Sequence, residues 1–205
     1  MPHPFTLVIG TKRYSSWSLR PWLLMKMAGL AFDEVEIALR QPDTRRQVLE
    51  WSPSGKVPLL IHDTVRIWDS LAICEYLAER DPGLWPADRE ARALARSVSA
   101  EMHSGFMPLR QNCPMDVCAA TPMADPLPEV AGDIARIQAL WGECRARFGA
   151  GGPFLFGGFT VADAMYAPVV TRFRTYAIPQ DAVCEAYCRA VEQLPAMREW
   201  VEAAG

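Results

Sequence analysis

The chain has 205 residues, of which 50% are hydrophobic and 22% are charged, and its formal net charge is -3. This length can bury a large core in one large domain or two small ones, and the composition is that of an ordinary globular protein. Charges of both signs are scattered along the sequence, which argues against nucleic acid as a partner because phosphate binding depends on clustered Lys and Arg.

The sequence contains no pattern for a membrane or for export. No apolar run approaches the roughly 20 residues that span a bilayer. The first residues, Met1-Pro2-His3-Pro4, lack the basic and apolar regions of a signal peptide. We therefore expect no membrane partner and a cytoplasmic location.

The spacing of the cysteines and histidines argues against a metal site. The six cysteines form no Cys-x-x-Cys pair, and the three histidines do not lie near them at metal-ligand spacing. Cys74 and Cys144 fall on apolar helical stripes and are expected to be buried thiols.

Residues 1–80 predict a mixed α/β domain. In chain order we expect a strand at 5–9, a helix at 19–27, a strand at 32–38, a short helix at 44–51, a hairpin of strands at 57–61 and 64–68, and a helix at 70–79. This order of βαβ, α and ββα predicts a thioredoxin-like domain.

The start of the first helix bears on function. Pro21 is tolerated most easily in the first turn of a helix, where its missing N–H would be unpaired anyway. Ser18 is therefore expected to be the N-cap, which leaves Ser15 and Ser16 in the preceding loop. A hydroxyl in that loop lies beside the free N–H groups of a helix N-terminus, where negative charge is stabilised.

The remainder of the chain predicts an all-helical domain. The breaker-rich segment 81–86 is the expected linker, and the helical domain is expected over 87–205, beginning with a helix at 87–106. The proline-rich segment 111–128 predicts a long loop, and apolar residues from Ile134 to Phe148 repeat as one helical face.

A capping box, with Thr160 as N-cap and Asp163 in the place of the usual Glu, begins another helix in this half. Pro168 interrupts that helix and predicts a kink.

Two segments place anion-binding helix starts after strands. The first is Ser15-Ser16-Trp17-Ser18-Leu19-Arg20, and the second runs from Gly55-Lys56-Val57-Pro58 to Trp68-Asp69-Ser70. Asp69 and Ser70 are both good N-cap residues, so plain helix capping is the alternative to ligand binding. Each motif alone is weak evidence for a binding site, and the specificity lies in the order of the motifs along the chain.

In this order the segments resemble the cytosolic glutathione S-transferase family, and the Thr160 capping box with the kinked helix after it extends the resemblance over essentially the whole chain. The likeness is to serine-type members, nearest to zeta-like bacterial ones. It implies a thioredoxin-like glutathione-binding domain, an all-helical C-terminal domain, glutathione as co-substrate without a metal, a homodimer and a role in detoxification.

The resemblance assigns the ends of glutathione to particular residues. Asp69 would face the ligand ammonium, and the Ser70 hydroxyl with its helix N-terminus would face the γ-glutamyl carboxylate. Val57, before an expected cis peptide bond to Pro58, would pair with the cysteinyl backbone. Lys56 would meet the glycyl carboxylate.

The thiol must become a thiolate to attack an electrophile, and Ser15 is the residue that we expect to stabilise it. Ser16 and Tyr14 remain rival donors. The zeta motif Ser-Ser-Cys-Ser is matched here by residues 15–18, but Trp17 replaces the cysteine. That change counts against maleylacetoacetate isomerisation and against a thiol-disulfide reductase.

The electrophile pocket is expected between the domains, lined by Trp17, Met107, Arg110 and Gln111. We thus predict a glutathione transferase that conjugates the thiolate to a small, apolar electrophile. The alternatives are a glutathione-dependent isomerase like maleylacetoacetate isomerase, and a non-catalytic interaction protein with the same fold. Glutathione binding separates the enzymes from the interaction protein, and a disulfide reduction assay tests the reductase.

Overall fold

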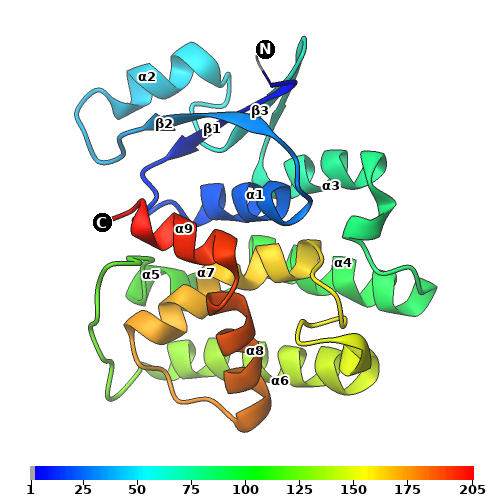
Figure 1. Ribbon diagram of the computed structural model, residues 1–205. Helices are drawn as coiled ribbons and strands as arrows, with labels where there is room; N and C mark the ends of the chain where they lie inside the picture. The colour runs from blue at the N-terminus through cyan, green and yellow to red at the C-terminus, as the bar shows by residue number, and fades with distance from the viewer. Residues whose placement is uncertain (1–2) are drawn as a thin grey trace.

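The computed structural model describes residues 3–205, which form a sheet domain and a helical domain packed against each other (Figure 1). The sheet domain contains β1 (Phe5–Gly10), α1 (Ser16–Met27), β2 (Phe32–Ile37), α2 (Thr44–Trp51), β3 (Leu59–His62), β4 (Val65–Trp68) and α3 (Ser70–Arg80). The helical domain contains α4 (Arg89–Ser104), α5 (Met107–Asn112), α6 (Pro128–Phe148), α7 (Val161–Thr175), α8 (Ala182–Glu192) and α9 (Pro195–Glu202), with short 3₁₀ turns η1 (Pro82–Leu84) and η2 (Gly149–Gly151). The predicted fold class, an α/β domain followed by an all-helical one, is confirmed.

The sheet separates two apolar layers. Its strand order is β2-β1-β3-β4, with β1 parallel to β2 and antiparallel to β3. Side chains alternate across a strand, so Leu7 and Ile9 join the core beneath α1 and α3, whereas Val8 packs with Val48 of α2 on the opposite face. Figure 1 shows α2 on the far side of the sheet from the helical domain.

Helix α7 lies at the centre of the helical domain and contacts α1, α4 and α8. The predicted capping box begins it: Asp163 Oδ2 accepts hydrogen bonds from Thr160 N at 2.8 Å and Thr160 Oγ1 at 3.0 Å. Pro168 lies inside the helix, as expected from its position. Because this helix touches both domains, its start helps to fix their relative position.

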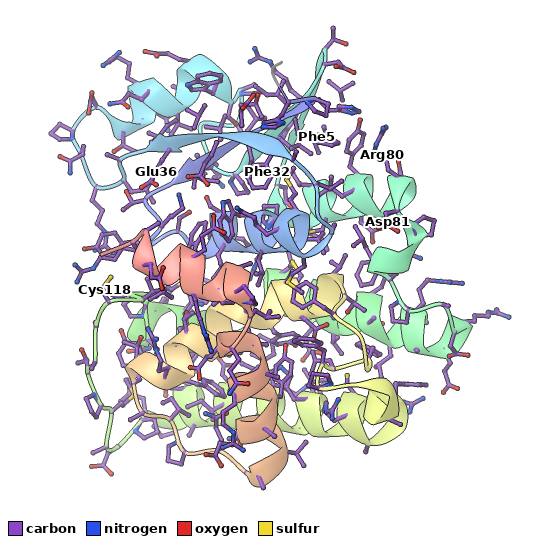
Figure 2. The ribbon with its side chains drawn as sticks, in the orientation of Figure 1. Phe5, Phe32, Glu36, Arg80, Asp81 and Cys118 are labelled. Atoms are coloured by element: carbon purple, nitrogen blue, oxygen red, sulfur yellow. The ribbon has the colours of Figure 1, made fainter. Side chains whose placement is uncertain are left out.

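The last helix ties the loop before α1 to the helical domain. The Trp200 indole N–H of α9 donates to the Lys12 carbonyl at 3.0 Å, and its ring meets that of Trp22 with centroids 5.0 Å apart. In Figure 2, Arg80 and Asp81 mark the end of α3, where the chain leaves the sheet domain, and Cys118 lies near the end of α9. The Sγ atom of Cys118 is 3.4 Å from the Ala204 carbonyl.

The expected start of α1 is wrong. The helix begins at Ser16, because Leu19 N donates to the Ser15 carbonyl at 3.1 Å and Ser15 is the N-cap. The Ser18 hydroxyl does not cap the helix; it accepts hydrogen bonds from Gly10 N and from the Ser15 hydroxyl. Pro21 therefore lies beyond the first turn, inside the helix.

Other element boundaries shift by a few residues. Val57 and Pro58 precede β3 instead of belonging to it, and Gln111 lies in α5 instead of in the predicted loop. Helix α6 begins at Pro128, a residue that suits a first helical turn, so the loop covers 113–127. The expected burial of Cys74 and Cys144 is confirmed, and burial raises the pKa of each thiol to about 12.

Over residues 3–205, none of the helices combines the length and the apolar character that crossing a bilayer requires.

Candidate functional site

Residues of both domains line a cleft of about 750 Å³. Its walls come from the first turn of α1, the loop before β3, the start of α3 and the last turn of α4. The predicted site residues that line it are Trp17, Lys56, Val57, Pro58, Asp69 and Ser70. Residues as far apart in the sequence as Trp17 and His103 are thus brought to one surface.

Asp69 is held at the N-terminus of α3. Its Oδ1 atom accepts hydrogen bonds from Leu71 N at 2.9 Å and from Ala72 N at 3.3 Å, which makes it the N-cap. The backbone of Asp69 has a φ of 77°, a conformation that few non-glycine residues adopt. The side chain is 44% exposed, and it lines the cleft.

Ser70 follows in the first turn of α3 and is almost completely buried. Its hydroxyl oxygen accepts a hydrogen bond of 3.3 Å from Arg20 Nη1 of α1. The start of α3 therefore combines a helix N-terminus, a hydroxyl and a nearby guanidinium, all of which favour a carboxylate.

The loop between α2 and β3 forms the opposite wall. The Val57-Pro58 peptide bond is cis, as expected. Gly55 has a φ of 65°, which glycine adopts without strain, and the Lys56 N–H donates to the Ser54 hydroxyl at 3.2 Å. This turn places Lys56 at the cleft, so one wall carries a cation and the other carries the Asp69 carboxylate.

The three candidate thiol donors lie beside the cleft without lining it. The Ser15 hydroxyl is buried and donates to Ser18 Oγ at 2.7 Å, and Ser16 is the first residue of α1. The Tyr14 ring packs under the guanidinium of Arg40, 3.8 Å from the ring centroid. Trp17 is the residue of this segment that reaches the cleft.

Trp17 lines the cleft and contacts residues of both domains. The Arg20 guanidinium lies 4.3 Å and the Arg110 guanidinium 4.8 Å from its ring, as in cation–π contacts. Arg110 of α5 therefore lies against the Trp17 ring. Met107, Arg110 and Gln111 do not line the cleft; Met107 is 51% exposed on α5.

Sequence reasoning missed Arg20 and His103. Arg20 is fully buried, and its Nε and Nη2 atoms have no partner among the described residues. Burial, with help from Arg110 and Arg172, lowers its pKa to about 9, so it still carries a charge at neutral pH. The signal for Arg20 was a cation in the otherwise apolar run from Leu19 to Met25. His103 carried no local signal, because its cleft partner Asp69 lies at the start of α3.

A metal site is not indicated within residues 3–205, where no group of three or more His, Cys, Asp or Glu side chains is placed to hold an ion.

Comparison with known proteins identifies both domains. Residues 14–80 match the family model of the glutathione S-transferase N-terminal domain, and residues 128–203 match that of the C-terminal domain. A probable maleylacetoacetate isomerase of Caenorhabditis elegans is 36% identical over 96 residues, which is 46% of this chain and 44% of the relative. Glutathione S-transferase 1 of Dianthus caryophyllus is 33% identical over 99 residues, 47% of this chain and 45% of the relative. The matches thus span about half the length of the curated relatives.

Solved structures share the fold over nearly the whole chain. A glutathione transferase homologue from Burkholderia, with bound glutathione, has a TM-score of 0.72 at 24% identity and covers 97% of this chain and 96% of its own. Ure2p in complex with glutathione has a TM-score of 0.72 at 17% identity, with 98% and 99% covered. At such identities the likeness shows the fold alone. With both family models matched on the expected architecture, the chain belongs to the glutathione S-transferase family.

Proposed function

We propose that this chain binds glutathione in the cleft, stabilises the thiolate with a serine hydroxyl, and conjugates it to a small electrophile. The observation that carries the proposal is the convergence of Lys56, Val57, Asp69 and Ser70 on one cleft. Glutathione has two carboxylates, an ammonium and a thiol. The cleft offers a cation, an exposed backbone segment, a carboxylate and a helix N-terminus, which match the charged groups and the peptide backbone of the ligand.

The ligand's charges fix its direction in the cleft. The γ-glutamyl carboxylate suits the N-terminus of α3 and the Ser70 hydroxyl, with the buried Arg20 charge behind it. The ammonium beside that carboxylate suits the Asp69 carboxylate, which lines the cleft. The glycyl carboxylate then lies toward Lys56, and the cysteinyl backbone pairs with Val57 as an added strand would.

Activation of the thiol requires a preference for the thiolate. Lowering a thiol pKa from about 8.5 by two units takes roughly 2.7 kcal/mol. One hydroxyl donor together with the N-terminus of α1 supplies an amount of this size. Ser15 takes this role in the proposal, which requires its hydroxyl to turn from Ser18 to the sulfur; Ser16 and Tyr14 are the rivals.

The electrophile is proposed to enter on the Trp17 side of the cleft, near α5 with Met107, Arg110 and Gln111. Trp17 presents an aromatic surface that is 37% exposed, which suits an apolar substrate. A homodimer, a cytoplasmic location and a role in detoxification complete the proposal.

A glutathione-dependent isomerase is the second candidate. It is favoured by the relatives named maleylacetoacetate isomerase, which include one from Rhizobium meliloti that is 41% identical over 96 residues. Trp17 stands where the related motif has cysteine and counts against it. Turnover of maleylacetoacetate without consumption of glutathione would favour the isomerase, and conjugate formation with an activated aryl halide would favour the transferase.

Asp69→Asn is expected to weaken glutathione binding about tenfold to hundredfold, because it removes the charge that pairs with the ammonium. Asparagine keeps an oxygen for the N-cap and adopts positive φ more readily than most residues, so folding is expected to be retained. Calorimetric titration of glutathione into the purified chain measures the change.

The matched control is Asp88→Asn. Asp88 caps α4 through a 2.8 Å hydrogen bond from Ala91 N, and it does not line the cleft. This variant is expected to bind glutathione as the parent does. Absence of binding by the parent chain would reject the catalytic proposals and favour a non-catalytic interaction protein.

A further inference from the structure

His103 brings the helical domain into contact with the glutamyl end of the cleft. It lies in the last turn of α4, and its Nε2 atom is 3.2 Å from Asp69 Oδ2. The other oxygen of Asp69, Oδ1, accepts hydrogen bonds from the first turn of α3. The Asp69 carboxylate is thus held from two sides, by its own helix and by a side chain of the other domain.

The surroundings of the imidazole, taken together, disfavour a positive charge on it. Its Nδ1 atom is buried and has no partner among the described residues, and its ring meets the edge of Trp17 with centroids 5.4 Å apart. Burial lowers the pKa of His103 from its usual value; Asp69 opposes this effect, and the charges of Arg20 and Arg110 add to it. His103 is therefore neutral at pH 7.

The hydrogen position follows from this geometry. Nε2 faces a carboxylate and Nδ1 faces no acceptor, so the neutral ring carries its proton on Nε2. In this form it orients Asp69 without cancelling its charge. Protonation at Nδ1 makes the ring a cation beside Asp69, in competition with any other cation at that oxygen.

The charged and titratable groups that face His103 come from several elements. Asp69 approaches it from the cap of α3, Arg20 from α1 and Arg110 from α5. Of these, Asp69 alone favours the imidazolium. A ligand ammonium bound to Asp69 adds one more positive charge to the group, so ligand and proton oppose each other.

We propose that His103 is a positioning residue for the glutamyl end of the ligand: neutral, it orients Asp69 toward the ligand ammonium, and protonated, it competes with that ammonium. This inference rests on the proposed binding of glutathione to the cleft. Because linkage between two bound cations is reciprocal, acidification lowers ligand affinity by the same factor by which the ligand disfavours protonation of His103.

The test is calorimetric titration of S-methylglutathione between about pH 7 and about pH 5, a window in which histidine titrates. The S-methyl group removes the thiol as a titrating group, and the carboxylates of the ligand titrate below this window. The affinity of the parent chain is expected to fall about fivefold over the window.

His103→Gln keeps an N–H donor that can orient Asp69 but cannot become a cation. It is expected to retain most of the affinity at pH 7 and to lose the decline on acidification. His103→Leu removes the donor and is expected to weaken binding about threefold at pH 7. His62→Gln is the matched control, because His62 contacts Tyr76 outside the cleft; it is expected to keep the decline.

The outcomes separate this inference from the function on which it rests. An undiminished decline in His103→Gln, or no decline in the parent chain, would overturn the role of His103 and leave glutathione binding in place. Failure of the parent chain to bind S-methylglutathione at any pH in the window would instead reject the proposed function. Thermal unfolding of each variant at both ends of the window identifies any loss of folding.

Discussion

Replacing Asp163 with alanine is expected to lower the free energy of unfolding by about 4 kcal/mol at pH 7. The carboxylate is fully buried and accepts hydrogen bonds from Leu155 N, Thr160 N and Thr160 Oγ1 at 3.0, 2.8 and 3.0 Å. Alanine leaves these donors buried without an acceptor and removes the capping box of α7, the helix that touches both domains. Urea denaturation followed by circular dichroism measures the loss.

Asp181→Ala is the control for the loss of a helix cap alone. Asp181 caps α8 through a 2.8 Å hydrogen bond from Cys184 N, at an exposed position. Its replacement is expected to cost about 1 kcal/mol. If the two variants lose equal stability, burial of the Asp163 network adds nothing to capping and the argument for that residue is wrong.

The same carboxyl is expected to make stability depend on pH. Burial raises the pKa of Asp163 to about 6, against about 3.9 in an unfolded chain. A raised folded-state pKa adds stability that is complete below about pH 4 and is lost as the pH rises through about 6. The stability difference between the parent chain and Asp163→Asn should therefore shrink by about 3 kcal/mol from pH 4 to pH 7. A difference that is constant across this range in urea titrations would contradict the assignment.

The second large effect is expected in catalysis. Ser15→Ala should lower kcat/KM for conjugation of an activated aryl halide about 100-fold, because the thiolate loses its hydroxyl donor. The pKa of the bound thiol should rise by one to about two units, as followed by thiolate absorbance. The affinity for S-methylglutathione should change little, since this ligand has no thiolate to stabilise.

Two further variants identify the donor if Ser15→Ala retains activity. Ser16→Ala and Tyr14→Phe remove the rival hydroxyls, and the substitution that raises the thiol pKa identifies the hydroxyl it removed as the donor. Ser97→Ala controls for the substitution itself, because Ser97 is exposed on α4 and its hydroxyl donates to the Ala93 carbonyl. Unchanged thiol pKa values in all three site variants would assign thiolate stabilisation to the backbone at the start of α1.

Local pattern was sufficient for most of the architecture. The alternation of apolar and acidic side chains predicted β2, and Asp69 and Thr160 were recognised as helix caps because capping depends on residues within one turn. The start of α1 was missed because two good cap residues, Ser15 and Ser18, compete there. A long-range contact decided between them: Ser18 Oγ accepts the Gly10 N–H from the end of β1.

The candidate site likewise contains residues that short motifs identified and residues that only the tertiary structure placed. Lys56, Val57, Asp69 and Ser70 were identified from short motifs, and the fold brings them to one cleft. Ser15 was also chosen from its motif, and its role stays a prediction. Met107, Arg110 and Gln111 were assigned by position in the chain, and they do not line the cleft. The packing of α5 against the rest of the helical domain, which decides this, cannot be read from local sequence.

The sequence by itself determined the fold class, the order of the elements in the first 80 residues and the helix caps at Asp69 and Thr160, because periodicity, turn residues and caps act over a few neighbouring positions. Only the tertiary structure decided which side chains share the cleft. Arg20 beneath Ser70 and His103 beside Asp69 depend on contacts between α1, α3 and α4, and their charges are set by burial, which no short stretch of sequence encodes.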